Sequence, residues 1–432
     1  MPRIAFVGAG SVEFTRDLLV DLLSFPELAG AEIALHDIDP ERLETAEAVA
    51  RWTSARLDPS ARIEAHLDRR RALDGADYAI NMIQVGGHAA TLLDFEIPAR
   101  HGLRQTIGDT LGIGGIFRAM RTIPVMLAIG EDMAELCPHA PLLNYTNPMA
   151  MLCQAYAQGS PHGRIVGLCH SVQYTTRTLA EYVGVPFEEI TFLGAGVNHQ
   201  AWILRFERAG EDLYPRLDER IEADPELQRH VRVDMYRRLG RFPTESSEHS
   251  AEYLPWYMHD DEALARFRIP VGEYVRRSEE NLAEYARTRD AIARGGELAE
   301  DFERSVEYAP LIVHSIETGV ERVIYGNVPN DALIDDLPAG ACVEVPCVVD
   351  RTGVRPTRVG SLPPQCAALN RTFLNVVELT VAAALEGSRE RLVQAALLDP
   401  NAAASLDPDT IATVCDELAE AHGLELAAPV RA

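Results

Sequence analysis

The sequence is poor in positive charge and has no long apolar run. Its 432 residues contain 40 Lys and Arg against 66 Asp and Glu, which gives a formal net charge of −26 at pH 7. A surface this acidic repels phosphate backbones and anionic lipid headgroups, so we expect neither nucleic acid nor a membrane as a partner. No uninterrupted apolar stretch reaches about 18 residues, the length that predicts a membrane-spanning helix.

Cysteine is also scarce and irregularly placed. There are seven cysteines, an odd number, and they are scattered along the chain, which argues against a disulfide framework. The chain begins with a strand-like segment after Met1 and shows no signal-peptide pattern. Both observations predict a protein of the reducing cytoplasm. With 47% apolar and 25% charged residues, the composition is that of a soluble globular protein rather than a disordered one.

Short apolar segments alternate with amphipathic ones in the first 200 residues. Strands are predicted at 4–7, 32–35, 78–83, 141–144 and 164–168, with helices at 17–23 and 42–56. Strands that alternate with helices predict a parallel sheet with right-handed crossovers. We therefore expect an α/β first domain over residues 1–195.

The remainder of the chain, residues 196–432, has a different pattern. A strand is predicted at 193–206 and another at 342–350; helices are predicted at 218–240, 279–294, 366–385 and 389–398. This mixture predicts an α+β second domain. Because no linker rich in Gly, Ser or Pro separates the two parts, we expect them to pack closely.

A glycine-containing turn directly follows the first predicted strand. Gly8 and Gly10 allow the backbone to approach a pyrophosphate, and Ser11 opens a helix whose N-terminus favours the negative charge. Glu13 replaces the third glycine of the dinucleotide fingerprint. Asp37 ends the second strand, where a carboxylate binds the ribose hydroxyls of NAD; it is preferred over Asp39. The sequence thus predicts a Rossmann-like, doubly wound NAD-binding domain.

Three polar segments follow later strands of the predicted sheet. They span residues 84–88, 107–115 and 144–149 and include Gln84, His88, Asp109, Asn144 and Asn147. The middle segment is too rich in glycine for a helix interior and suits close approach of the backbone to a ligand. Ligands of open α/β folds bind at the carboxyl edge of the sheet, where these segments should meet.

Cys169 follows a predicted strand, and His199 lies near the start of another. A thiolate and a neutral imidazole together suit a divalent transition metal, and two protein ligands leave positions open for a substrate. The alternative is a buried cysteine beside a hydrogen-bonded histidine.

Taken together, these segments resemble glycoside hydrolase family 4, and most closely its melibiase-type α-galactosidases. The resemblance runs almost end to end. It is carried by GAGS at 8–11, NYTNP at 144–148, CHSV at 169–172, NH at 198–199, TESSEH at 244–249, AEY at 251–253, YGNV at 325–328, DDLP at 335–338 and VEV at 343–345. It implies the two-domain architecture of lactate and malate dehydrogenases, with a mixed α+β C-terminal domain.

The resemblance also implies a mechanism, in which these enzymes are the NAD-dependent exceptions to the two-carboxylate scheme. NAD⁺ removes a hydride from C3 of the sugar, and the resulting ketone acidifies the proton on C2. A metal stabilises the enolate, a base takes the proton, the aglycone leaves from C1 and water adds. The hydride then returns to C3, so NAD⁺ is regenerated.

Positions carried over from the family give candidate roles. Cys169 and His199 would bind Mn²⁺ or another divalent cation, and Asn147 would hold sugar hydroxyls. His170 replaces the Asp that is the proposed acid in phospho-sugar members. Tyr253 and His249 are both candidates for the C2 base. Asp109 is assigned to the same catalytic group, and Gln84 and Asn144 to the cofactor site.

The substrate is predicted from side chains near the expected sugar pocket. These depart from the melibiases and comprise His88, Tyr174, Gln200, Trp202 and Arg241. Such a set could bind an anion through charge-assisted bonds. A neutral α-galactoside is favoured narrowly over an anionic α-glycoside such as a sulfoquinovoside or a galacturonide. A 2-hydroxy-acid dehydrogenase is the alternative from another class, and a homodimer or homotetramer is expected.

Overall fold

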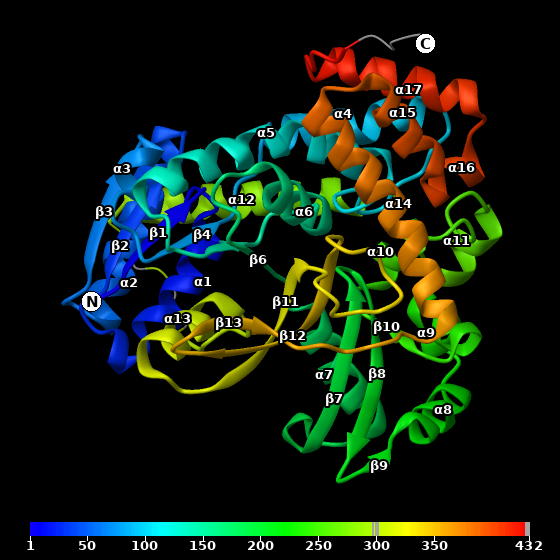
Figure 1. Ribbon diagram of the computed structural model, residues 1–432, viewed down its shortest axis with the longest axis horizontal. Coiled ribbons are helices and arrows are strands. Elements are labelled where there is room, and N and C mark those ends of the chain that lie inside the picture. The colour runs from blue at the N-terminus through cyan, green and yellow to red at the C-terminus, as the bar shows by residue number, and fades with distance from the viewer. Residues whose placement is uncertain (296–297, 299–301, 428–432) are drawn as a thin grey trace.

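A single sheet of 13 strands runs through the molecule in the computed structural model, which describes residues 1–295, 298 and 302–427 (Figure 1). The strands are β1 (Arg3–Val7), β2 (Glu32–His36), β3 (Arg62–His66), β4 (Tyr78–Asn81), β5 (Leu142–Asn144), β6 (Ile165–Leu168), β7 (Ile190–Val197), β8 (Gln200–Arg208), β9 (Glu211–Asp212), β10 (Phe242–Pro243), β11 (Arg322–Pro329), β12 (Cys342–Asp350) and β13 (Gly353–Pro356). The helices are α1 (Val12–Leu23), α2 (Pro40–Leu57), α3 (Arg69–Leu73), α4 (Gly87–Arg100), α5 (Gly112–Leu136), α6 (Met149–Gly159), α7 (Ser171–Val183), α8 (Tyr214–Ala223), α9 (Val231–Leu239), α10 (Ser247–Glu252), α11 (Asp261–Phe267), α12 (Glu273–Ala293), α13 (Tyr308–Thr318), α14 (Pro364–Glu386), α15 (Arg389–Leu398), α16 (Pro400–Ser405) and α17 (Pro408–Ala421), with short 3₁₀ turns at Pro26–Leu28, Phe187–Glu189 and Leu227–Arg229.

The first six strands form the parallel half of the sheet, at the left of Figure 1, in the order β3-β2-β1-β4-β5-β6. This order is that of dinucleotide-binding folds. β1 is central and almost wholly apolar because helices cover both faces of such a sheet. The predicted α/β class and the five predicted strands are confirmed; β3 was not predicted. The carboxyl ends of β1, β4, β5 and β6 lie at one edge, where the predicted site residues follow.

The second half of the sheet is antiparallel and continues from β6 through β11, β12, β7 and β8 to β10. The single strand predicted at 193–206 is wrong, because β7 and β8 form a hairpin whose turn holds Asn198 and His199. His199 has a positive φ of 63°, which reverses the chain there. Residue 195, the predicted domain boundary, lies within β7.

Proline and aspartate explain the differences among the helices. The helix predicted at 218–240 is two helices, α8 and α9, because Pro225 disfavours helical conformation at Asp224. Two unpredicted helices, α16 and α17, follow α15, and both begin at an Asp-Pro pair whose carboxylate caps the helix. The helices predicted at 279–294, 366–385 and 389–398 are confirmed as α12, α14 and α15.

Helix α5 was missed because its first turn is glycine-rich. A Cβ on Gly114 or Gly115 would stand within 2.8 Å of the backbone of Gly108 or Thr110, so glycine lets the helix pack against the loop that carries Asp109. By length and composition, α5 could cross a membrane. However, 72% of the most apolar 18-residue stretch of this helix is buried inside the protein, which is typical of a core helix.

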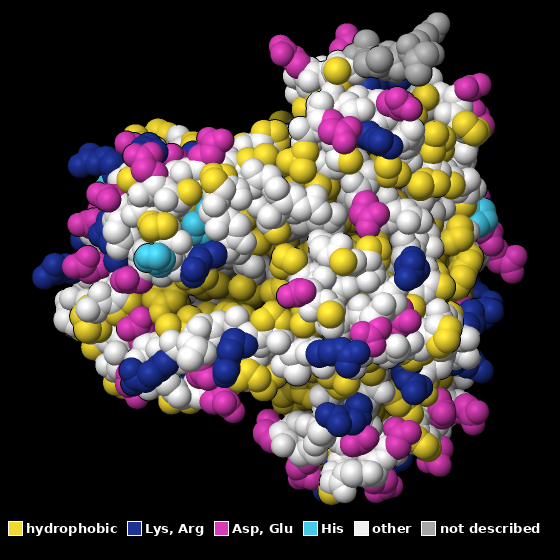
Figure 2. All heavy atoms as spheres, in the orientation of Figure 1, with side chains coloured by type: hydrophobic (Ala, Val, Ile, Leu, Met, Phe, Trp, Pro, Cys, Tyr) yellow, Lys and Arg dark blue, Asp and Glu magenta, His cyan; other side chains and the backbone are white. Residues whose placement is uncertain are grey.

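One large hydrophobic cluster spans both halves of the sheet, and a smaller cluster surrounds Trp202. The C-terminal helices α15, α16 and α17 gather at the upper right of Figure 1, beyond α5. On the face drawn in Figure 2, acidic and basic side chains are interspersed rather than segregated. The negative charge is therefore not concentrated in one patch on that face.

Candidate active site

The glycine turn after β1 has the geometry predicted for a dinucleotide site. Gly8 has a φ of +89°, and a Cβ there would lie 2.9 Å from the backbone nitrogen of Ile83. The Gly10 N–H donates to Asp37 Oδ2 at 2.8 Å, and Ser11 precedes α1 as its N-cap residue. The turn and the carboxylate are thus in contact at the carboxyl edge of the sheet. This bare backbone cradle, beside the start of α1, fits a pyrophosphate.

The other two predicted cofactor residues are placed differently from each other. Gln84 is exposed, and its side-chain amide donates a long bond to Thr91. Asn144 is fully buried within an internal network: its Oδ1 accepts from Asn81 at 2.8 Å, and its Nδ2 donates to the Thr146 carbonyl at 3.0 Å. Asn144 is therefore committed to internal hydrogen bonds at the end of β5.

Cys169 and His199, 30 residues apart in sequence, meet at the end of β6. Cys169 Sγ lies 3.4 Å from His199 Nε2. Burial raises the pKa of the Cys169 thiol to about 12, and the nearby carboxylates of Glu245 and Glu344 act in the same direction. A divalent cation would reverse this effect, because metal-bound cysteine is a thiolate.

The hydrogen bonds of Thr110 fix the tautomer of His199. The Thr110 hydroxyl donates to Asp109 Oδ1 at 2.7 Å, and His199 Nδ1 lies 2.9 Å from the same hydroxyl oxygen. Because the single hydroxyl proton is used on the carboxylate, the hydroxyl accepts from His199 Nδ1–H. The lone pair of the imidazole then resides on Nε2, which faces Cys169. This arrangement is the one that a metal-binding histidine requires.

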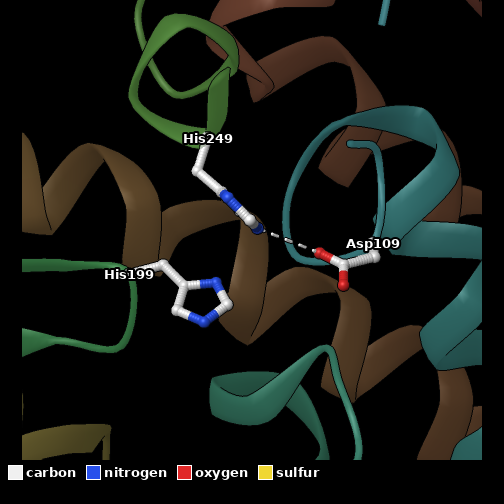
Figure 3. Close-up of side chains that lie close together, drawn as sticks. All are labelled: Asp109, His199 and His249. Atoms are coloured by element: carbon white, nitrogen blue, oxygen red, sulfur yellow. Dashed lines mark ion pairs between the residues drawn. The ribbon is translucent and has the colours of Figure 1, made fainter. Parts of the chain in front are cut away.

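Asp109 connects several of the predicted catalytic residues. Figure 3 shows its ion pair with His249, whose Nε2 is 3.5 Å from Asp109 Oδ1, with His199 beside them. The other carboxylate oxygen accepts from Asn147 Nδ2 at 3.1 Å. Burial alone would raise the pKa of Asp109, but the neighbouring His249 and Arg118 outweigh burial and hold it well below its usual range. Asn147 Oδ1 is buried without a partner among the described residues.

Tyr253 lies behind this group. Its hydroxyl is 3.5 Å from His199 Nδ1, and its ring packs edge-on against Phe373. Burial raises the pKa of Tyr253 well above 10, and the charges of Asp109 and Glu252 add to the effect. A divalent cation bound at His199 would act in the opposite direction, as it would for the Cys169 thiol.

His170 forms a pair that the sequence did not predict. Its Nδ1 lies 3.0 Å from Glu307 Oε1, at the start of α13. Burial alone would lower the pKa of His170, but the hydrogen bond to Glu307 raises it to about 9. The imidazole is 44% exposed, so a protonated His170 can reach a ligand.

A pocket of about 260 Å³ opens beside His170. Its lining includes Tyr174, Arg232 and Glu245. Arg232 belongs to α9, and its Nη1 donates to Thr175 Oγ1 at 3.0 Å, while its Nε has no partner among the described residues. Arg232 thus lines this pocket, and sequence reasoning missed it among the neighbouring arginines of α9.

Four predicted substrate residues lie elsewhere or are already engaged. Arg241 bonds to the Gly240 carbonyl and stacks on Tyr214, at the end of β8–β10 rather than at the pocket. Trp202 is fully buried in the smaller hydrophobic cluster, and its Nε1 donates to Asn370 Oδ1. Gln200 is buried beside the same asparagine. His88 bonds to Ser278 of α12.

The whole chain was then compared with known proteins. The Family 4 glycosyl hydrolase profile matches residues 3–185, and the Family 4 glycosyl hydrolase C-terminal domain profile matches residues 194–402. The chain belongs to glycosyl hydrolase family 4. Its curated relatives agree: an α-galactosidase of Bacillus subtilis (strain 168) is 44% identical, with 98% of both chains covered.

Two more distant relatives are another α-galactosidase and an enzyme named for a different sugar. An α-galactosidase of Rhizobium meliloti (strain 1021) is 36% identical over 97% of this family 4 chain and 88% of its own. An α-galacturonidase of Lachnoclostridium phytofermentans is 28% identical over 92% and 91%. The resemblance read from the sequence is therefore confirmed.

Solved structures show the same fold. A crystal structure of the Bacillus subtilis glucosidase lplD has a TM-score of 0.89 at 26% identity and covers 97% of this chain and 99% of its own. A 6-phospho-α-glucosidase from gut microorganisms, in complex with NAD and Mn²⁺, has a TM-score of 0.82 at 21% identity, covering 99% and 100%. Malate dehydrogenase from Plasmodium falciparum reaches 0.51 at 13% identity, covering 91% and 100%, which is a likeness of fold. The expected dehydrogenase-like architecture is confirmed.

Proposed function

We propose that the chain is an NAD⁺- and Mn²⁺-dependent α-glycosidase of the cytoplasm that hydrolyses small α-glycosides, with a neutral α-galactoside as the first candidate. The observation that carries the proposal is the pair formed by Cys169 and His199, whose Nε2 lone pair faces the thiol at 3.4 Å. The nearly full-length likeness to α-galactosidases supports the sugar class. Seven free cysteines are consistent with a reducing compartment.

The cofactors supply the redox and Lewis-acid chemistry: NAD⁺ accepts and returns a hydride, and the metal polarises sugar oxygens. Cys169 and His199 would hold the metal, and the turn at Gly8 and Gly10 would hold the pyrophosphate. Asn147 would bind a sugar hydroxyl through the Oδ1 that lacks a partner. His170, kept protonated by Glu307, would donate the proton on its Nε2 to the leaving oxygen.

For the base that takes the C2 proton, His249 is the better candidate of the two predicted residues. It lies between Asp109 and Ser246, and its Nε2 has no hydrogen-bond partner among the described residues. Tyr253, in contrast, packs its ring against Phe373, and its hydroxyl lies 3.5 Å from His199 Nδ1 rather than on the side of Cys169.

A rate assay tests the activity. In the presence of NAD⁺, Mn²⁺ and a reductant, the enzyme should release 4-nitrophenol from 4-nitrophenyl α-galactoside. The hydrogen on C2 of the sugar should exchange with deuterated water during turnover. Cys169→Ser should abolish turnover while leaving NAD⁺ affinity nearly unchanged. Net formation of NADH from a 2-hydroxy acid, without hydrolysis of any α-glycoside, would instead favour a dehydrogenase.

Arg232 favours a second candidate, an anionic α-glycoside such as a sulfoquinovoside or a galacturonide. The guanidinium lies at the pocket wall with donors to spare, and planar arrays of N–H donors suit carboxylates and sulfonates. The carboxylates of Glu245 and Glu248 also lie near the Arg232 guanidinium and offset part of its positive charge. A neutral sugar therefore keeps first place.

Substitution of Arg232 separates the two candidates. Arg232→Met should lower kcat/KM for an anionic α-glycoside by about 10- to 100-fold, the effect of a lost charge-assisted bond, and should change that for α-galactoside much less. Arg237→Met, on the exposed face of the same helix, is the matched control. Arg241→Met tests the residue predicted from sequence. Equal losses on both sugars would remove Arg232 from substrate recognition.

A further inference from the structure

Glu245 stands out by its backbone and by its position. Among the described residues, five non-glycine residues have positive φ, and two of them are His199 at 63° and Glu245 at 68°. A side chain in this conformation is strained, and such strain persists where function or surrounding structure requires it. The two strained residues face each other, with His199 Nε2 3.7 Å from Glu245 Oε2.

The neighbours of Glu245 hold it in this conformation. Thr244 is fully buried and exchanges two hydrogen bonds with Ala201 of β8, since its N–H donates to the Ala201 carbonyl and its hydroxyl accepts from the Ala201 N–H. Ser246 caps α10 by accepting from the His249 N–H. Between these two anchors, the left-handed conformation directs the carboxylate of Glu245 toward Cys169 and His199.

The spacing of the three groups is that of atoms around one cation. Metal bonds of about 2.0–2.3 Å place neighbouring ligand atoms roughly 3–4 Å apart. Cys169 Sγ and His199 Nε2 are 3.4 Å apart, and the ligand atoms of Cys169, His199 and Glu245 all lie within 4.8 Å of one another. Among the described residues, no arginine or backbone N–H donates a hydrogen bond to the Glu245 carboxylate. Its ion-pair partners within 4 Å are His199 and His249, and the charges of His170 and Arg232 also reach it.

A second group of three, Asp109, His199 and His249, also satisfies this spacing. Its carboxylate is already engaged, because Asp109 accepts from Thr110 and Asn147 and pairs with His249. His199 presents Nδ1 to that side, and this nitrogen carries a proton that is donated to Thr110. The lone pair on Nε2 points the other way, toward Cys169 and Glu245.

We propose that the carboxylate of Glu245 is a third protein ligand of the metal, beside Cys169 and His199. A thiolate and a carboxylate would balance the two charges of the cation, and a six-coordinate ion would keep positions open for two sugar oxygens. The metal would then be retained before the sugar binds. This inference rests on the proposed function, because it assumes the metal site of that function.

The test is equilibrium binding of Mn²⁺ to the whole chain without sugar. Binding is monitored through the loss of the free Mn²⁺ signal in electron paramagnetic resonance. Glu245→Gln should weaken binding by more than about 100-fold, because even outer partners of metal ligands are worth about 10- to 100-fold. Glu248→Gln, three residues along in the same segment, is the matched control and should bind as wild type does. Cys169→Ser should bind no Mn²⁺.

A glycine variant separates ligation from a structural role. Glycine adopts positive φ without strain, so Glu245→Gly should unfold at an equal or higher temperature than wild type in the absence of metal. It should also lose the increase in unfolding temperature that Mn²⁺ produces in wild type. A lower unfolding temperature without metal, together with a normal response to Mn²⁺, would overturn the proposal.

Two other outcomes would also overturn it. Unchanged Mn²⁺ affinity in Glu245→Gln, with loss of C2 hydrogen exchange, would make Glu245 a base rather than a ligand. Loss of Mn²⁺ binding in Asp109→Asn but not in Glu245→Gln would place the metal on the other side of His199. In both cases wild type still binds Mn²⁺ and hydrolyses its sugar. Failure of the proposed function would differ, because wild type itself would then neither bind Mn²⁺ nor hydrolyse any α-glycoside.

Discussion

At the scale of single residues, the proposed metal site depends on Thr110, which orients His199 without being a ligand itself. Thr110→Val keeps the shape of the side chain but removes the hydroxyl that fixes the tautomer of His199. We expect Mn²⁺ affinity to fall by about 10- to 100-fold, as for other groups that orient metal-binding histidines. Equilibrium binding of Mn²⁺ measures this, and Thr110→Ser, which keeps the hydroxyl, should bind within about threefold of wild type. If the valine and serine variants bind alike, the hydroxyl does not set the tautomer.

The sequence revealed residues whose chemistry is unusual and missed those whose role depends on neighbours. Cys169 and His199 could be found because thiol and imidazole side chains in family motifs indicate a metal. Thr110 and Glu245 lie inside segments that the sequence analysis singled out, yet nothing local shows that Thr110 contacts His199, 89 residues away. Trp202 was misjudged because its position on β8 directs it into the core rather than the pocket.

At the scale of elements, a buried carboxylate joins α3 to α5. Asp132 of α5 accepts from Arg69 Nε at 2.8 Å and from Arg70 Nη1 at 2.6 Å. Burial alone would raise the pKa of Asp132, but the two guanidinium hydrogen bonds outweigh it and hold the pKa below its usual value. The folded value is thus lower than the unfolded one, so the stabilisation is present above the unfolded pKa and is lost as pH falls through the folded pKa.

Asp132→Asn should therefore lower the free energy of unfolding by about 1–3 kcal/mol at pH 7, the usual contribution of hydrogen bonds to a charged group. The difference from wild type should shrink as pH falls below about 4, where the carboxylate of the unfolded chain is protonated. Unfolding temperatures at pH 7 and at the lowest pH that keeps wild type folded measure this. Glu131→Gln, on the exposed side of the same turn, is the control. An equal loss at both pH values would contradict the charge argument.

The elements most easily predicted were those whose burial is uniform. The inner parallel strands are apolar on both faces, so their sequences stand out as short apolar segments. The edge strand β3, which exposes Arg62 and Glu64, was missed. The hairpin β7–β8 was merged into one strand because no glycine or proline occupies its turn; Asn198 and His199 do, and His199 takes the positive φ. α5 was missed because its glycines serve contact with the loop at 108–110, a tertiary requirement that outweighs local helix propensity.

At the scale of the whole molecule, the continuous sheet couples the two sequence halves. Gly326 and Asn327 of β11 pair with Leu168 and Gly167 of β6, so the antiparallel half extends directly from the dinucleotide-binding half. Helix α14 from the C-terminal half packs against α5 and α6 from the N-terminal half. The large hydrophobic cluster includes residues of both halves. The candidate active site lies where they join, because Cys169 comes from one half and His199 from the other.

We therefore expect the chain to unfold in one cooperative transition, although the pattern of predicted strands and helices suggested two domains. Scanning calorimetry should show a single peak whose calorimetric and van't Hoff enthalpies agree. Saturating NAD⁺ should move that entire peak to higher temperature, because a ligand bound to one part of a cooperative unit stabilises all of it. If the halves unfolded independently, NAD⁺ would shift only the peak of the half that holds the turn at Gly8 and Gly10. The second peak would then stay where it was, and the sheet would not be the cooperative unit.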